Sequence, residues 1–401
     1  RSTTLQLSDR CCMSLPGQSS GRRWQPPGAG SLCDGNEHHM AELLLVSTTP
    51  PVEVMDALTA AGIRSLEVSV SASQTGRNPW WIVEATDGKH FVKQLQGEPD
   101  DVRRRLEATE QFEQDRHRVV GWGPDVGAPV LQSSAVSGVV IYTHVETMDE
   151  AQLGPRLRTQ EVQPMEMVKI GKFLAALHSS GGTPAHTKSF TQMSTAVAGL
   201  SLPAFINATA GQLSVWRLLH RDREFQVGVA NLAKASAGAV TVPGHGDLRV
   251  DQVLIAEDSW MVCDWEEYSR LDPAWEVGSL AGDLLSTVLG GSQSEFVQQA
   301  SRPWETAEVA GTFESRIRYA LPLLHALLDS YCRERPATKA DESFRDRAAG
   351  FAGWHLIERM LAAGSVGMSV SGLARGIGGV GRGILLDPQG FDAMVIEAGT
   401  G

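Results

Sequence analysis

Two stretches, His245-Gly-Asp-Leu-Arg-Val-Asp-Gln-Val-Leu254 and Met261-Val-Cys-Asp-Trp-Glu266, decide how this chain is interpreted. The first places a polar His-Gly-Asp-Leu loop before an apolar pair, and the second is an apolar run that ends at Asp264. Short apolar runs on either side of a polar turn predict a strand, a turn and a second strand. We therefore predict a hairpin that brings Asp247 and Asp264, 17 positions apart, to one end.

Two carboxylates held together in this way suit phosphoryl transfer. One carboxylate lies near the hydroxyl that accepts the phosphoryl group, and the other binds the metal ion that bridges the phosphates. The nearest template is the kinase catalytic loop H-R-D-L-x-x-x-N, which is followed later in the chain by a metal-binding Asp. We predict Asp247 as the catalytic residue and Asp264 as a ligand of Mg²⁺, because a hard cation prefers anionic oxygen.

The chain departs from this template at two positions, since Gly246 replaces the Arg and Gln252 stands in place of the Asn. The side-chain oxygen of Gln252 can still bind a metal ion, so we predict Gln252 as the second metal ligand. Its side chain is one methylene longer than Asn, which leaves backbone adjustment, altered metal occupancy and lost catalysis as open interpretations. Asp251 is a substitute ligand, although neighbouring strand residues face opposite ways.

A nucleotide site is predicted upstream, around Lys93. This lysine lies in the apolar strand Phe91–Leu95, where a fixed ammonium group would bind the α- and β-phosphates. A lysine in such a strand is costly unless its tip is paired or exposed. We predict that Glu107, on the following helix, is the carboxylate that pairs with Lys93, with Glu110 as the rival.

Two glycine-containing segments are candidates for a phosphate site. In the turn over residues 73–79, Gly76 and Asn78 could bring backbone N–H groups to a phosphate. Gly376–Gly381 fits G-x-G-x-x-G, but it follows a predicted helix and no strand. We interpret this second segment as a flexible C-terminal connection.

The pattern of apolar residues predicts an α+β protein in which a small antiparallel sheet precedes a mainly helical region. Residues 1–39 have no apolar periodicity and are interpreted as a disordered extension, or as foreign to the native protein. Residues 40–147 form the predicted N-lobe and residues 148–401 the helical C-lobe. The predicted strands are 66–70, 80–85, 89–95, 130–136 and 139–145, and the predicted helices are 51–61, 100–118, 167–178, part of 212–235, 274–289, 306–333 and 343–363.

Composition limits the classes of function. Of 401 residues, 42% are hydrophobic and 20% charged, and the formal net charge of −12 provides no global basic field for nucleic acid or a membrane surface. No apolar run approaches the length of a membrane span, and the five cysteines lack zinc-ligand spacing. We expect a cytoplasmic protein with neither nucleic-acid nor membrane partners.

Taken together, these residues resemble the aminoglycoside phosphotransferase/choline kinase-like family over most of residues 60–365. The resemblance is carried by the strand that ends at Lys93, the helix Ile170–His178, the two aspartate blocks and the helix start Asp272–Leu280. It implies a bilobal protein-kinase-like fold and transfer of the γ-phosphate of Mg-ATP to a hydroxyl group. By match of position, Asp247 would be the catalytic residue, Asp264 a metal ligand and Lys93 the nucleotide lysine.

The finer form of the motifs resembles phosphotransferase-like proteins of class V lanthipeptide and thioamitide biosynthesis. This resemblance implies phosphorylation of Ser or Thr in a ribosomal precursor peptide, with a partner lyase completing the dehydration. The alternatives are a kinase of a small molecule such as an aminoglycoside antibiotic, or a pseudokinase that binds without transfer. A cationic antibiotic would favour an acidic pocket, for which the candidate acidic residues are Glu266, Glu267, Asp283, Glu305 and Glu308.

Overall fold

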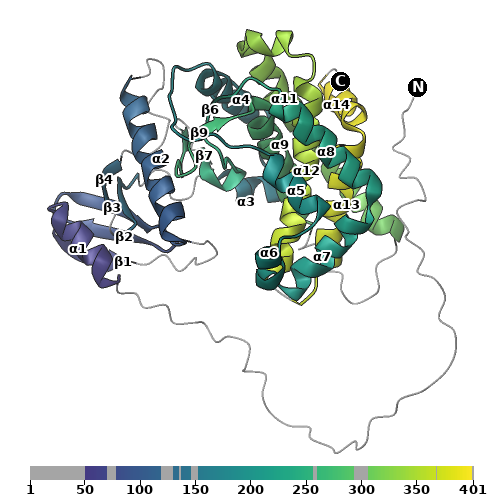
Figure 1. Ribbon diagram of the computed structural model, residues 1–401. Helices are drawn as coiled ribbons and strands as arrows, with labels where there is room; N and C mark the ends of the chain where they lie inside the picture. The colour runs from purple at the N-terminus through teal and green to yellow at the C-terminus, as the bar shows by residue number, and fades with distance from the viewer. Residues whose placement is uncertain are drawn as a thin grey trace, which may run out of the picture. The chain divides into compact units, whose positions relative to one another are not determined.

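The computed structural model describes residues 50–69, 78–118, 130–134, 137–145, 152–255, 260–292, 306–366 and 368–399 (Figure 1). The predicted extension over residues 1–39, Gly76, Glu305 and the predicted lobe boundary between residues 147 and 148 lie outside the described residues. Within the described residues, no helix is both long and apolar enough to cross a membrane.

The N-terminal part is a five-stranded antiparallel sheet, as predicted. The strand order is β1-β2-β3-β5-β4. The strands are β1 (Ser65–Ser69), β2 (Trp80–Ala85), β3 (Gly88–Gln94), β4 (Val130–Ser134) and β5 (Val139–Thr143), accompanied by the helices α1 (Val52–Ala60) and α2 (Pro99–Arg118).

The alternation of side chains along β3 decides where Lys93 points. Val92 is fully buried among α1 residues such as Leu58, on one face of the sheet. Lys93 is directly opposite Val140 of β5, so the two side chains share the other face. Val140 packs there against Leu106 of α2. Lys93 therefore projects from the α2 face of the sheet.

The remainder of the chain is mainly helical, which confirms the predicted α+β class. Figure 1 shows α9, α11 and α12 close together, and α9 packs against both α11 and α12 around an apolar core. The helices are α3 (Leu153–Arg158), α4 (Pro164–His178), α5 (Thr191–Ala198), α6 (Leu202–Asn207), α7 (Ala210–Arg221), α8 (Arg223–Ala237), α9 (Pro273–Gly290), α11 (Thr306–Glu334), α12 (Phe344–Ser365), α13 (Gly372–Leu386) and α14 (Pro388–Ala398).

Two short strand pairs hold the loops that carry the two aspartates. The predicted hairpin is confirmed as β7 (Val253–Ile255) paired with β8 (Trp260–Val262). A second pair, β6 (Val242–Gly244) with β9 (Ser269–Leu271), encloses it in sequence and was not predicted. Because β6 and β9 fix both outer ends, the loops after β6 and β8 are each anchored at two points.

The interpretation of Gly376–Gly381 as a flexible connection was wrong, because this segment lies inside α13. Its glycines allow close packing against α12. A Cβ atom on Gly381 would lie 2.5 Å from the carbonyl oxygen of Gly353, and one on Gly378 would lie 2.5 Å from the sulfur of Met360. Small residues at a helix contact let two backbones approach closely. Because these contact positions are glycines and not large apolar residues, the sequence lacks the apolar spacing that would predict a helix here.

Candidate active site

The loop after β6 presents Asp247. Gly246 adopts φ +86°, a left-handed conformation, and a Cβ atom there would lie 2.1 Å from the carbonyl oxygen of Glu267. The Arg of the kinase template therefore cannot occupy this position without moving the backbone. His245 is fully buried and donates from Nε2 to the carbonyl oxygen of Cys263 at 2.9 Å. The side chain of Asp247 is consequently exposed at the end of a fixed loop.

Glu276 of α9 fastens this loop to the helical core. One carboxylate oxygen accepts a 2.7 Å hydrogen bond from the backbone N–H of Gly246, and the other lies 2.7 Å from Nε2 of His178. Burial alone would raise the pKa of Glu276, but its hydrogen bond and charge interaction with His178 outweigh burial and lower the pKa. His178, which closes α4, also lies 2.7 Å from the hydroxyl of Tyr331, so it is a packed residue of the core.

Asp264 follows β8 and lies against Lys93. Its backbone has φ +72°, an uncommon conformation for a residue with a side chain, of the kind found at functional sites. Its Oδ1 is 2.5 Å from Nζ of Lys93. Burial alone would raise the pKa of Asp264, but the charge and hydrogen bond of Lys93 lower it overall. Asp264 is thus held as an ionised carboxylate.

Lys93 has two carboxylate partners, and Glu107 is not one of them. Its Nζ lies 2.8 Å from Glu266 in addition to Asp264. Burial lowers the pKa of Lys93, but the charges of Asp264 and Glu266 outweigh it and raise the pKa. The predicted Lys93–Glu107 pair is wrong because Glu107 faces outward from α2, with its side chain 54% exposed and 3.4 Å from His186.

The inward face of α2 instead carries a cation. Residues two positions apart on a helix point to nearly opposite sides, so Arg105 faces inward where Glu107 faces outward. The Arg105 side chain is 0% exposed, and its Nη1 lies 3.1 Å from Glu266. Glu266 is therefore the glutamate that pairs with Lys93, a role that was predicted for a glutamate of α2. The rival Glu110 accepts a hydrogen bond from Ser133 of β4 and likewise does not meet Lys93.

Asn78 joins the same network through its side chain. Its Nδ2 donates to Glu266 at 3.1 Å, and its Oδ1 accepts from the backbone N–H of Gln96 at 2.9 Å. Asn78 thus lies next to the Lys93 site, where its side chain supports Glu266. The predicted approach of its backbone N–H to a phosphate stays a prediction.

Gln252 bridges the two aspartate loops. Its Oε1 accepts a 2.9 Å hydrogen bond from the backbone N–H of Arg249, and its Nε2 lies 3.5 Å from Oδ2 of Asp264. The substitute ligand Asp251 points elsewhere, since its side chain is 58% exposed and lies 3.4 Å from Arg249.

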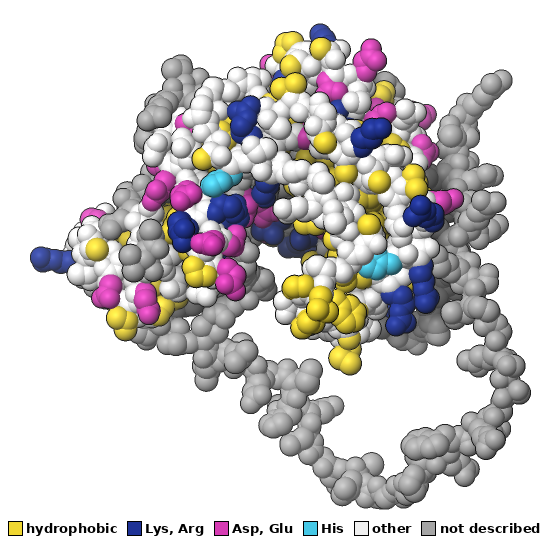
Figure 2. Space-filling view, in the orientation of Figure 1, with side chains coloured by type: hydrophobic (Ala, Val, Ile, Leu, Met, Phe, Trp, Pro, Cys, Tyr) yellow, Lys and Arg dark blue, Asp and Glu magenta, His cyan; other side chains and the backbone are white. Residues whose placement is uncertain are grey.

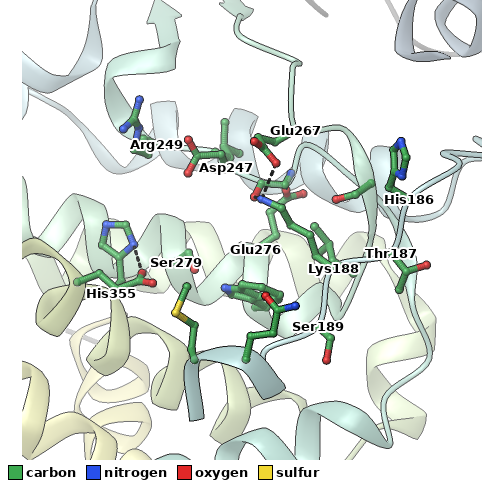
Figure 3. Close-up of a pocket in the computed structure, with 18 of the residues that line it drawn as sticks. His186, Thr187, Lys188, Ser189, Asp247, Arg249, Glu267, Glu276, Ser279 and His355 are labelled. Atoms are coloured by element: carbon green, nitrogen blue, oxygen red, sulfur yellow. Dashed lines mark hydrogen bonds and ion pairs between the residues drawn. The ribbon is translucent and has the colours of Figure 1, made fainter. Parts of the chain in front are cut away.

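A cavity of about 730 Å³ opens beside Asp247. Figure 3 shows Asp247 between Arg249 on one side and the paired Lys188 and Glu267 on the other. Its charged lining is balanced, with four acidic and four basic side chains. They are Asp247, Glu267, Glu276 and Glu358, and Arg104, Lys188, Arg249 and Arg359.

Of the described candidates for an acidic pocket, namely Glu266, Glu267, Asp283 and Glu308, only Glu267 lines this cavity. Glu267 lines the cavity, but Arg104 approaches it to 2.9 Å and Lys188 to 3.1 Å. Asp283 lies 3.0 Å from His355 and accepts a hydrogen bond from the backbone of Val250. Figure 2 likewise shows acidic and basic side chains interspersed, without a field of one sign on the visible face.

Several cavity residues were missed by the sequence interpretation. Lys188 precedes α5, Arg104 lies on α2, and His355, Glu358 and Arg359 lie on α12. None belongs to a local motif, because each reaches the cavity only through the packing of distant helices. The cavity residues that do lie in motifs noted in the sequence come from the His245–Leu254 block, such as Asp247 and Arg249, and from the helix start Asp272–Leu280, such as Trp275.

The donor chemistry of the site fits a magnesium ion held with few protein ligands. Among the described residues, no group of three or more His, Cys, Asp or Glu side chains is arranged for a metal ion. Mg²⁺ commonly takes one or two carboxylates and completes its shell with water and substrate phosphates. The ionised Asp264, beside the ammonium of Lys93, provides such a carboxylate.

Comparisons with known proteins agree with this geometry. A family model described as the phosphotransferase enzyme family matches residues 81–311, more than half of the chain. A search of curated proteins finds no match.

Solved structures show more distant similarity. A choline/ethanolamine kinase family protein from Mesorhizobium loti is 16% identical, with a TM-score of 0.44 over 90% of this chain and 96% of that chain. A choline kinase from Streptococcus pneumoniae is 15% identical, with a TM-score of 0.42 over 78% and 99%. A spectinomycin phosphotransferase is 12% identical, with a TM-score of 0.40 over 74% and 93%. These similarities are too distant to indicate a substrate.

Proposed function

The chain belongs to the phosphotransferase enzyme family and is a kinase-like phosphotransferase, and we propose that it transfers the γ-phosphoryl group of ATP to a hydroxyl group of a small molecule. One observation carries the proposal. The half-buried Lys93–Asp264 ion pair is linked through the side chain of Gln252 to the loop that carries Asp247, and Asp247 lines the adjacent cavity.

The nucleotide half of the proposal rests on charge. Lys93 stays protonated because its pKa is raised, so its ammonium can bind phosphate oxygens, while Glu266 and Arg105 hold its position. Asp264 would hold Mg²⁺, which when bound neutralises negative charge on the phosphates. The predicted contribution of Gly76 backbone N–H groups stays a prediction.

Asp247 orients the acceptor. Its carboxylate would accept a hydrogen bond from the attacking hydroxyl, and a loose transition state makes this positioning matter more than strong basicity. Hydrogen bonds of the two preceding residues fix the position of Asp247. Gly246 donates to Glu276, and His245 donates to the carbonyl oxygen of Cys263.

The cavity favours a compact acceptor of low net charge. Its volume of about 730 Å³ lies within the usual range of small-molecule sites, about 300–1,000 Å³. Its balanced lining supports neither a polycation such as an aminoglycoside nor a strongly anionic compound. A Ser or Thr side chain of a precursor peptide, processed with a partner lyase, is the alternative acceptor.

The test is an acceptor panel with mass-spectrometric detection of one added phosphoryl group. The panel contains hydroxyl amino acids, sugars, choline, an aminoglycoside and a Ser/Thr-rich peptide, each incubated with Mg-ATP. Asp247→Asn should lower transfer by about 10²–10⁴-fold, whereas Asp100→Asn, whose side chain is 92% exposed on α2, should not. Unchanged transfer in Asp247→Asn would overturn the site assignment.

The same experiment separates a pseudokinase from an enzyme. ATP analogue binding without phosphoryl transfer to any acceptor or to water would identify a binding module. Hydrolysis of ATP that depends on Asp247 would identify an enzyme whose acceptor lies outside the panel. Phosphorylation of the peptide alone would identify the peptide-modifying alternative.

A further inference from the structure

Gln252 occupies the position where the kinase template has a metal-binding Asn, and its contacts assign it another role. Resting on the proposed function, we propose that Gln252 is a positioning residue that ties the Asp247 loop to Asp264, and that its side-chain oxygen does not bind the metal ion. The side chain is nearly fully buried, at 4% exposed, between the two loops.

The orientation of the amide is fixed by its neighbours. The backbone N–H of Arg249 can only donate, so the Gln252 atom 2.9 Å from it must be the oxygen. The NH₂ group then faces Asp264, with 3.5 Å between Nε2 and Oδ2. An amide NH₂ group has no lone pair for a cation and can only donate, so Gln252 presents hydrogens toward the proposed metal position.

The extra methylene of Gln252 has a local explanation. Val250–Gln252 form one turn of 3₁₀ helix with Arg249 as the N-cap, and Gln252 reaches back three residues to the N-cap N–H. This reach is made by Gln or Glu in a capping box. Asn is one methylene shorter. The residue that departs from the template is therefore the one that caps this turn.

The backbone of Gln252 is also fixed, which limits any rearrangement. Its carbonyl oxygen accepts from the backbone N–H of Cys263 at 3.0 Å and lies 3.4 Å from the Cys263 sulfur. To turn its side-chain oxygen to a metal ion, Gln252 would have to leave the N–H of Arg249. That N–H would then lose its hydrogen-bond acceptor, which is unfavourable for a donor that is partly shielded from water.

One residue thus sets the spacing of both aspartates. Arg249 follows Asp247 by two positions, and Asp264 follows Cys263 directly, so Gln252 contacts each loop next to its functional carboxylate. Loss of these contacts should disturb the alignment of Asp247 with the phosphates. The carboxylate of Asp264 would remain available for the cation.

The test measures Mn²⁺ binding by electron paramagnetic resonance, in the presence of a non-hydrolysable ATP analogue. Gln252→Met keeps the size of the side chain but has neither amide oxygen nor NH₂. Its Mn²⁺ dissociation constant should stay within about threefold of wild type, whereas its kcat should fall about tenfold or more, with KM for ATP nearly unchanged. Gln252→Asn, too short to cap, should behave in the same way.

The proposal is overturned if Gln252→Met weakens Mn²⁺ binding about tenfold or more, as Asp264→Asn is expected to do. It is also overturned if kcat is unchanged in both variants. Circular dichroism checks the fold of each, and Gln252→Asn takes the place of Gln252→Met if the latter does not fold. Mn²⁺ binding is measured in the presence of the ATP analogue. If the wild-type protein does not bind Mn²⁺ under these conditions, the proposed function itself is overturned.

Discussion

Gly246→Ala should damage both stability and activity. At φ +86° a side chain costs about 1–2 kcal/mol, since the left-handed region is unfavourable for L residues. The new Cβ atom would also lie 2.1 Å from the carbonyl oxygen of Glu267 and 2.9 Å from Oγ of Ser269. Relief of such a clash through backbone movement typically costs about 1–3 kcal/mol, so the expected loss is about 2–5 kcal/mol.

Urea unfolding followed by tryptophan fluorescence measures this loss. The matched control is Gly379→Ala in α13, where a Cβ atom would meet nothing within 4 Å. That helix-interior change should stabilise the protein by about 0.5–1 kcal/mol. Displacement of the adjacent Asp247 by about 1 Å should lower phosphoryl transfer by about 100-fold. A Gly246→Ala protein within about 1 kcal/mol of wild type, with full activity, would refute the assigned loop geometry.

Three further changes test the surrounding contacts. Glu266→Ala leaves the buried Arg105 with Asp101 as its remaining carboxylate partner, at 3.2 Å. The free energy of unfolding should therefore fall by about 3 kcal/mol. A variant that binds ATP more weakly but keeps the stability of wild type would contradict this prediction. Burial alone would raise the pKa of Glu276, but its imidazole partner lowers the pKa below the ordinary 4.5. The stabilisation from Glu276 is therefore present above pH 4.5, and the difference in unfolding free energy between wild type and Glu276→Gln should narrow as the pH falls below that value. A difference that widens with falling pH would contradict the direction of the pKa shift. Gly381→Ala should lower the thermal midpoint, because its Cβ atom would lie 2.5 Å from a backbone carbonyl of α12, and an unchanged midpoint would show that the helices can separate.

Much of the fold could be predicted because its signals are local. Alternating apolar residues located all five strands of the N-terminal sheet, and 3.6-residue spacing located the long helices α9, α11 and α12. The helix α13 was missed because its glycines, read as flexible, are contact positions against α12. That distinction depends on a partner helix that local spacing does not reveal.

The residues of the candidate site likewise fall into those that local motifs predict and those that depend on contacts between distant segments. Asp247, Asp264 and Lys93 could be selected because each lies in a short motif of recognisable order. The partner of Lys93 could not, because the choice between Glu107 and Glu266 depends on which face of α2 turns inward. The helical periodicity of α2 does not by itself show which face turns inward, since a buried Arg105 is as unusual as a buried Glu.

The Lys93–Asp264 ion pair has a consequence for the order of ligand binding. Under the proposed function, ATP supplies an anion for Lys93 and Mg²⁺ supplies a cation for Asp264, so both half-buried charges exchange partners and neither is left alone. ATP without metal would have to displace Asp264 from Lys93 and leave a half-buried carboxylate without a cation. Metal without ATP would draw Asp264 away from Lys93 and leave the ammonium with Glu266 as its one remaining carboxylate partner among those that contact it. Each ligand should therefore increase the affinity for the other by the same factor, which makes the empty site selective for the complex of the two.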